Sequence, residues 1–256
     1  MKKYIIILIL IFIMIYSLNI NNEEFTQEVE FLKKDATANF LIADQDGYHK
    51  SFNVDDLFAR NINNVADYAV KIRNTAVDFT DEQKQKIINS IRQIELLFNR
   101  VNYNYFEGSK ANKIPWTIGL MSGVQYENGL PHTRHRKIIL FSEYVTSCTE
   151  NELIKLLIHE KIHVYQKMYP SDVKIYLNSN KFSKFAQRKT VMNSRANPDL
   201  DEWIYKDFND VPYYSRYNHM PKNISDVTYY PNNTSGSEHP FEKMAYDLSN
   251  ELVAKL

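Results

Sequence analysis

Two histidines four residues apart, His159 and His163, enclose a glutamate at position 160. On a helix this spacing puts both imidazoles on one face, one turn apart, where they can bind the same metal ion. Glu160 directly follows the first histidine. Its carboxylate can therefore reach a water in the open coordination position of the ion, take its proton and pass it to a leaving amine. The pattern predicts a Zn²⁺ site in which Glu160 is the general base.

The segment that carries this pattern has the signals of a buried helix. Thr149 and Glu152 form a capping box, and Pro170 ends the helix near Tyr169. Apolar residues surround its first turns almost completely, which is typical of a helix inside a domain. The alternative to a metal site is two core histidines and a surface glutamate. Burying two imidazoles and a carboxylate without a metal partner would be costly, which favours the metal site.

A second acidic element lies far downstream, at Glu238-His239-Pro240-Phe241-Glu242-Lys243-Met244-Ala245-Tyr246. Together with His159-Glu160-Lys161-Ile162-His163 it resembles the gluzincins, the branch of the zincin metallopeptidases whose third zinc ligand is a glutamate on a second helix. The resemblance implies that Glu242 is the third ligand, with the small Ala245 one turn later where two helices approach closely.

Proline at position 240 bears on the choice of third ligand. Proline fits the first turn of a helix, so the helix begins at or just before Pro240. Glu242 then lies within the helix, whereas Glu238 and His239 lie at its entry. A packed helix holds a ligand more firmly than a loop does, which favours Glu242 among the three candidates. His239 is then expected to be a cleft residue near the metal.

The resemblance covers about the second half of the chain and implies a fold and an activity. The implied fold is α+β and zincin-like: a small antiparallel or mixed sheet packs on the buried helix, and an edge strand binds extended substrate. Short β-rich runs at residues 115–120 and 137–141 are expected to be strands paired antiparallel. The loop between them would bring His132 and His135 to the cleft wall. The implied activity is zinc-dependent hydrolysis of a peptide or protein substrate.

Gluzincins also use a tyrosine or a histidine to stabilise the oxyanion. No motif selects this residue within segment 170–236, whose poor periodicity predicts loops with short helices. The candidates in this segment are Tyr213, Tyr214, Tyr217 and His219.

The chain upstream of the strands is expected to be helical. Thr80 and Gln83 form a second capping box. Apolar residues then recur at helical spacing, which predicts a core-facing helix. These residues are Ile87, Ile91, Ile94, Phe98 and Val101. We expect one domain, residues 54–256, made of a helical part at 54–104 and a catalytic part at 105–256 that ends in a helix from Pro240.

The first residues have the features of a membrane segment. Lys2 and Lys3 precede an apolar run, and no small-residue cleavage site follows it. We predict an uncleaved signal-anchor at residues 1–20, with a cytoplasmic N-terminus, and a stalk at residues 21–53. This arrangement is a single-pass membrane protein with an exported body; secretion after cleavage is the alternative. Predicted glycosylation sites that fit an exported body are Asn223, Asn232 and Asn233.

Composition disfavours other classes of protein. Lys+Arg and Asp+Glu both number 31, so no global basic field supports nucleic-acid binding. The single cysteine, Cys148, excludes zinc fingers built on several thiolates and is expected to be inert. Two alternatives to the peptidase stay open. One is a zincin-like binding module without activity, displayed on a membrane or virion, and the other is a zinc hydrolase of a non-peptide amide or ester.

Overall fold

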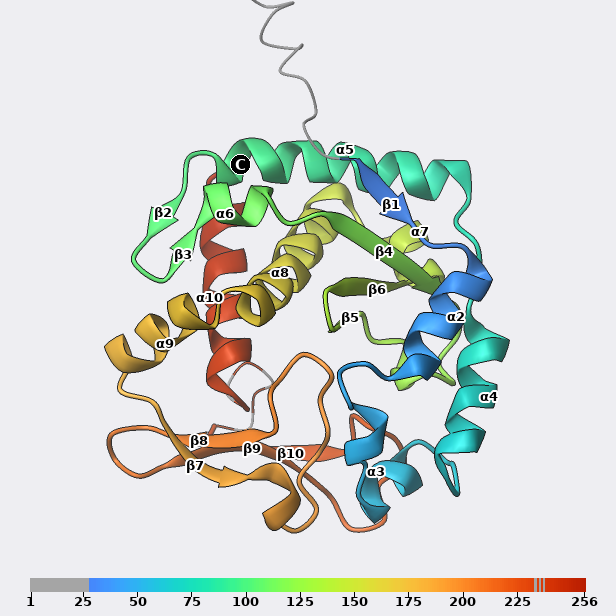
Figure 1. Cartoon of the computed structure of the whole chain (residues 1–256), viewed down its shortest axis with the longest axis vertical. Helices are drawn as coiled ribbons and strands as arrows, with labels where there is room; N and C mark the ends of the chain where they lie inside the picture. The colour runs from blue at the N-terminus through green and yellow to red at the C-terminus, as the bar shows by residue number, and fades with distance from the viewer. Residues whose placement is uncertain (1–27, 233, 235, 237) are drawn as a thin grey trace, which may run out of the picture.

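The computed structural model describes residues 28–232, 234, 236 and 238–256. The fold class is α+β, as predicted (Figure 1). The α-helices are α2 (Lys34–Ala43), α3 (Val54–Ala59), α4 (Val65–Thr75), α5 (Asp81–Phe98), α6 (Gly108–Asn112), α7 (Ser142–Ser147), α8 (Glu150–Met168), α9 (Pro170–Ser179) and α10 (Pro240–Val253). The strands are β1 (Val29–Phe31), β2 (Asn102–Tyr103), β3 (Phe106–Glu107), β4 (Trp116–Met121), β5 (His132–Arg134), β6 (Lys137–Phe141), β7 (Ser183–Gln187), β8 (Trp203–Lys206), β9 (Pro212–Tyr217) and β10 (Val227–Tyr230). Single 3-10 turns are η1 (His49–Ser51), η2 (Glu127–Gly129) and η3 (Arg188–Thr190).

The first sheet has the strand order β1-β4-β6-β5. β4 runs parallel to both β1 and β6, and only β5 is antiparallel to its neighbour β6. The predicted antiparallel pairing of residues 115–120 with 137–141 is therefore wrong. The intervening chain contains β5, which lies on the far side of β6, so the chain reverses twice and β4 and β6 point the same way. The composition of an apolar run does not encode the direction of its partner.

The main core lies where this sheet meets α5 and α8. The α5 residues Ile87, Ile91, Ile94 and Phe98 are fully buried in one cluster with the inner side chains of β4 and α8, so the predicted core-facing stripe is confirmed. Both predicted capping boxes are present at the starts of α5 and α8. Figure 1 shows α5 lying across one end of the molecule, next to the first sheet. These contacts make α8 a rigid element, because each buried apolar side chain contributes about 1.5–3 kcal/mol.

Helix α10 packs along α8 and begins at Pro240, as predicted. Its inward residues Ala245, Leu248 and Leu252 join the same core cluster. The small Ala245 side chain suits the close packing of the two helices. Side chains on their facing surfaces are therefore brought together although about eighty residues separate them in the sequence.

A second, antiparallel sheet has the strand order β10-β9-β8-β7 and lies at the opposite end of the molecule from α5 (Figure 1). The prediction of loops with short helices over residues 170–236 is therefore wrong, apart from α9. The strands are rich in tyrosine, which favours β-structure. Most of their side chains are partly exposed, so the alternation of buried and exposed residues that marks a strand is weak here.

Residues 28–53 belong to the folded body, so the prediction of a stalk is wrong for them. β1 hydrogen-bonds with β4, and α2 contributes Ala38 and Leu41 to a second apolar core. Three residues of strand are too short a run to stand out in the sequence. The rest of the predicted stalk, residues 21–27, lies outside the described residues.

The predicted single-pass arrangement, with a cytoplasmic N-terminus and an exported body, is corrected by the structure. Within residues 28–256 as described, no helix combines the length and the apolar character that crossing a membrane requires. The predicted signal-anchor at residues 1–20 lies outside the described residues.

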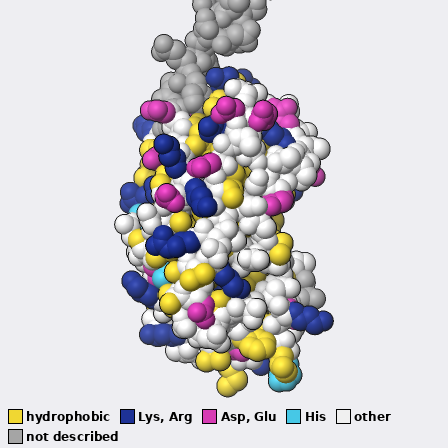
Figure 2. Space-filling model, turned by 90° about the vertical axis from the view of Figure 1, so that its right-hand side faces the viewer, with side chains coloured by type: hydrophobic (Ala, Val, Ile, Leu, Met, Phe, Trp, Pro, Cys, Tyr) yellow, Lys and Arg dark blue, Asp and Glu magenta, His cyan; other side chains and the backbone are white. Residues whose placement is uncertain are grey.

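Acidic and basic side chains are interspersed over the face shown in Figure 2, and hydrophobic side chains gather near its lower end. This mixture agrees with the formal net charge of +0 at pH 7. That face therefore presents no extended field of one sign.

Candidate metal centre

His159 and His163 of α8 and Glu242 of α10 meet where the two helices face each other. The two Nε2 atoms lie 3.1 Å apart, and Glu242 Oε2 lies 3.3 Å from His159 Nε2 and 3.7 Å from His163 Nε2. A tetrahedral Zn²⁺ ion with ligand distances of about 2.0–2.1 Å would place its ligand atoms about 3.3–3.4 Å apart. The three side chains therefore fit around one ion, and each offers one ligand atom to it.

Neighbouring side chains orient this cluster. His163 Nδ1 is 2.9 Å from Gln166 Oε1, so that nitrogen carries the proton and Nε2 keeps its lone pair for a metal. The Gln166 amide in turn donates to the backbone oxygen of Phe241, which ties α8 to α10. Asn197 donates to Glu242 Oε1 and leaves Oε2 facing the imidazoles. Each of these contacts restricts a ligand to the orientation that a metal requires.

The electrostatics of the cluster suit a bound cation. Burial alone would raise the pKa of Glu242, but the adjacent His163 and His159 hold it well below its usual value. Burial alone would lower the pKa of His163, but Glu242 and Asp199 raise it to about 9. Without a metal, His163 therefore carries a proton next to an ionised Glu242 at neutral pH. A metal ion would replace that proton, since it binds the neutral imidazole.

Glu160 is buried beside the ligands, with 2% of its surface exposed. Thr133 of β5 anchors its carboxylate, because Thr133 Oγ1 lies 2.8 Å from Glu160 Oε2. Burial, with the nearby Asp199 carboxylate, raises the pKa of Glu160 well above its ordinary value. Such a carboxylate holds a proton more firmly than an exposed glutamate does.

A cleft of about 570 Å³ opens at this cluster. Its walls come from α8, from α10, from residues 195–199 and from the end of β10, and they include His159, Glu160, Glu242 and Tyr246. The ring of Tyr246 lies against His159, with ring centroids 4.6 Å apart. Pockets of this size are typical of small-ligand and catalytic sites.

Of the other residues predicted to lie in the cleft, His132 lines it and His239 does not. His132 lines the cleft but is 2% exposed, and its ring nitrogens contact Tyr126 Oη and the backbone oxygen of Leu130. His239 does not approach the cluster: its ring caps α10 at the amide of Phe241 and faces β8 on the other side. The expectation that His239 lies near the metal is therefore wrong, because capping the helix turns its ring away.

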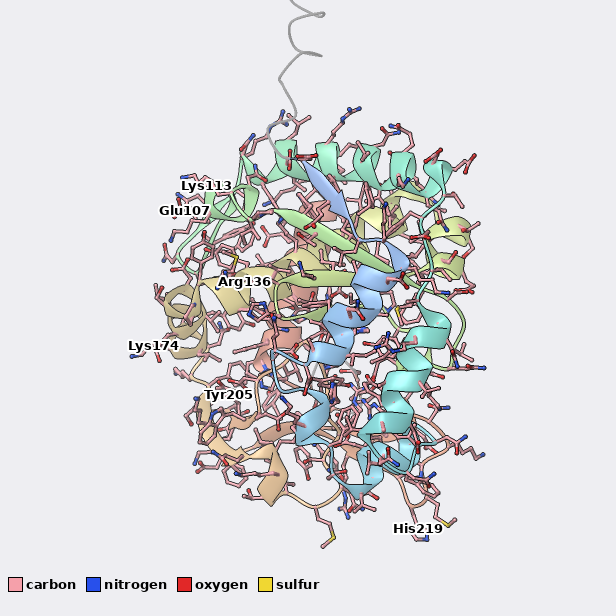
Figure 3. All side chains as sticks on the ribbon, turned by 45° about the vertical axis from the view of Figure 1, so that its right-hand side comes forward. Glu107, Lys113, Arg136, Lys174, Tyr205 and His219 are labelled. Atoms are coloured by element: carbon pink, nitrogen blue, oxygen red, sulfur yellow. The ribbon has the colours of Figure 1, made fainter. Side chains whose placement is uncertain are left out.

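None of the predicted oxyanion candidates in segment 170–236 lines the cleft. Tyr214 stacks on Tyr230 within the second sheet, Tyr213 packs against Phe182, and Tyr217 is buried against Arg60. His219 is exposed at the lower end of the molecule, as Figure 3 shows. His135 lies at the turn after β5 and is absent from the cleft lining. Tyr213, Tyr214 and Tyr217 all lie on β9, and the pairing of this strand with β8 and β10, which the sequence did not predict, directs their side chains away from the cleft.

Glu238, the other candidate ligand, also lies apart from the converging atoms. Its Oε1 accepts from Arg195 and from Asn197, so it lines the cleft as one half of an ion pair. Of the predicted glycosylation sites, Asn223 is half-buried and accepts from the amide of Ser225, and Asn232 is exposed. Asn233 lies outside the described residues.

Several residues of the site were not predicted from the sequence. Tyr246 could have been found, because it follows Glu242 by one helical turn and must share its face. Thr133, Asn197, Asp199 and Tyr229 carried no signal in the sequence. Each reaches the cleft from a segment that only the tertiary structure brings there.

No protein-family model, no curated protein and no solved structure matches the chain. The resemblance to the gluzincins therefore rests on the residues of the two motifs.

Proposed function

We propose that this protein is a zinc-dependent hydrolase that cleaves peptide bonds and has a zincin-like catalytic part. The observation that carries the proposal is the convergence of His159 Nε2, His163 Nε2 and Glu242 Oε2 at metal-ligand spacing, beside the buried Glu160 and in a cleft. Two imidazoles and a carboxylate are a known catalytic zinc set. When bound, zinc supplies a water of lowered pKa and polarises the substrate carbonyl.

Glu160 is the proton carrier in this proposal. Thr133 holds one of its oxygens, so the carboxylate has a set orientation next to His159. A carboxylate held in this place can accept a proton from a metal-bound water and pass it to the leaving amine. The same residue therefore acts first as base and then as acid, as tuned carboxylates do in other hydrolytic sites.

Two further residues, Gln166 and Asn197, position the metal ligands. Gln166 fixes the tautomer of His163, and Asn197 holds the outer oxygen of Glu242. Because both partners are themselves anchored, His163 and Glu242 need little reorganisation to bind an ion.

The test is to replace Glu160 by glutamine, which keeps the shape but cannot take a proton. We expect full zinc content and hydrolysis of a peptide library slowed by about 10²–10⁴-fold, with no turnover of the library by the wild type in chelator. Glu150→Gln, an exposed carboxylate at the start of the same helix, is the matched control and should keep normal activity.

Three results would contradict the proposal. Zinc loss in Glu160→Gln would mean that Glu160 is a ligand. Near-normal turnover by that variant would mean that another group takes the proton. Absence of peptide hydrolysis by the zinc-loaded wild type would refute the function itself.

A further inference from the structure

Strand β5 forms the edge of the first sheet next to the cleft, where an extended peptide could add as a further strand. Strand addition needs free backbone groups along that edge. In an antiparallel pair, alternate residues direct their backbone groups toward the neighbouring strand and away from it. Thr133, the middle residue of β5, directs its backbone groups away from β6, and Pro131 and His135 flank the strand on either side.

Every backbone donor of these three residues is missing or taken. Pro131 has no N–H. The amide of Thr133 donates to Asp199 Oδ1 at 2.6 Å, and the amide of His135 donates to Asp46 Oδ2 at 2.9 Å. The outward oxygen of Thr133 accepts from Lys167 Nζ at 3.1 Å. The edge that would receive a substrate strand is therefore closed by side chains of the protein.

The closing segment, residues 195–199, is firmly held. Lys167 also donates to the backbone oxygen of Pro198, and the amide of Asp199 donates to Asn197 Oδ1. The amide of Ala196 donates to the buried carboxylate of Asp56. This segment lines the cleft and contacts β5 through Asp199, and the amide of Arg195 at its other end donates to the backbone oxygen of Ser215. Displacing it would therefore break several hydrogen bonds at once.

The size of the cleft also favours a short ligand over an extended segment of a protein. Its volume of about 570 Å³ falls within the range of roughly 300–1,000 Å³ that encloses drug-sized ligands. A peptide of a few residues has that size, whereas an extended segment of a protein would need to continue along an open edge. The cleft walls at Tyr229 and Tyr246 offer side-chain surfaces rather than a backbone ladder.

We propose that the site takes short peptides or chain ends, held by side chains of the cleft, and does not bind extended polypeptide by strand addition to β5. This inference rests on the proposed function and narrows its substrate class. It also departs from the expectation, drawn from the gluzincin resemblance, that the edge strand receives substrate.

Two measurements on the zinc-loaded full chain test the inference. The first is hydrogen exchange at the amide of Thr133, which needs no catalysis. We expect protection in the wild type, loss of protection in Asp199→Ala, and no change in Asp201→Ala, whose carboxylate contacts His239 and Tyr205 instead. The second compares kcat/KM for free dipeptides to tetrapeptides with that for long peptides blocked at both ends. The short peptides should be favoured at least about tenfold in kcat/KM, because the chain on either side of the cleaved bond of a long peptide has no open strand edge along which to continue.

Fast exchange at Thr133 in the wild type would overturn the inference, because the edge would then be open. Internal cleavage of the long blocked peptides at the rate of the short ones would also overturn it, while leaving the proposed function intact. Protection at Thr133 with no zinc-dependent turnover of any peptide would refute the proposed function and this substrate class together.

Discussion

Lys161 lies between the two histidines in the sequence, yet its side chain enters the core. It is 1% exposed, its Nζ lies 3.9 Å from the centroid of the Trp116 ring, and it donates to the backbone oxygen of Ile114. Burial lowers the pKa of Lys161 from 10.5 to about 7, although Glu95 acts in the opposite direction. The folded protein therefore contains an amine whose charge is costly at neutral pH.

The direction of the resulting pH dependence follows from proton binding. Between pH 7 and 10.5 the unfolded chain binds a proton at Lys161 that the folded chain releases, so the free energy of unfolding rises with pH in this window. This increase in the free energy of unfolding is lost as the pH falls toward the pKa of Lys161 in the folded protein. At about 1.36 kcal/mol per unit of pKa, the whole window corresponds to ~5 kcal/mol, and the interval from about pH 7 to pH 9 to ~2 kcal/mol.

The perturbation is Lys161→Met, which keeps the length and removes the amine. It also deprives the Ile114 oxygen of its donor, at a cost of ~1–3 kcal/mol that does not vary with pH. The measured quantity is the gap in unfolding free energy between variant and wild type, from denaturant titrations. We expect the variant to lose ~2 kcal/mol relative to the wild type between about pH 7 and pH 9. Chelator should be present throughout, because metal binding is itself pH-dependent.

Lys155→Met is the control, since Lys155 is exposed on the same helix and stays in water in both states. The difference in unfolding free energy between Lys155→Met and the wild type should be the same at each pH. An equally constant gap for Lys161→Met would refute the reasoning, because it would mean that folding does not change the proton affinity of this amine.

Three further predictions concern the site and its support. Glu242→Ala should lose most bound zinc while His239→Ala keeps it, as measured by metal per chain in folded variants; zinc retained by Glu242→Ala would exclude it as a ligand. Thr133→Val should lower kcat about 10- to 100-fold at unchanged KM, whereas Thr133→Ser should keep most activity, because only the serine retains the hydroxyl that holds the catalytic carboxylate; equal kcat in both would contradict this role. Arg60→Leu should lower the unfolding free energy by ~3–5 kcal/mol, because it removes the cationic partner of the buried Glu127 carboxylate, and a loss below ~1 kcal/mol in denaturant titrations would argue against that ion pair.

The parts of the site that lie close together in the sequence followed from local rules. Helical periodicity alone puts His159 and His163 on one face, and the structure places their Nε2 atoms 3.1 Å apart. The start of α10 at Pro240 was equally local, because the fixed backbone of proline suits the first turn of a helix. Such features depend on a few neighbouring residues, so composition and spacing were enough to predict them.

The parts that join distant segments depended on the tertiary structure. β1 enters the sheet from a segment predicted as a stalk, and β4 pairs parallel with β6 because β5 intervenes between them. Asp199 closes the edge of β5 although 66 residues separate it from Thr133. The packing of the whole core decides which strands pair and which side chain reaches an exposed amide. A local pattern of residues cannot predict that packing, because it depends on segments far apart in the sequence.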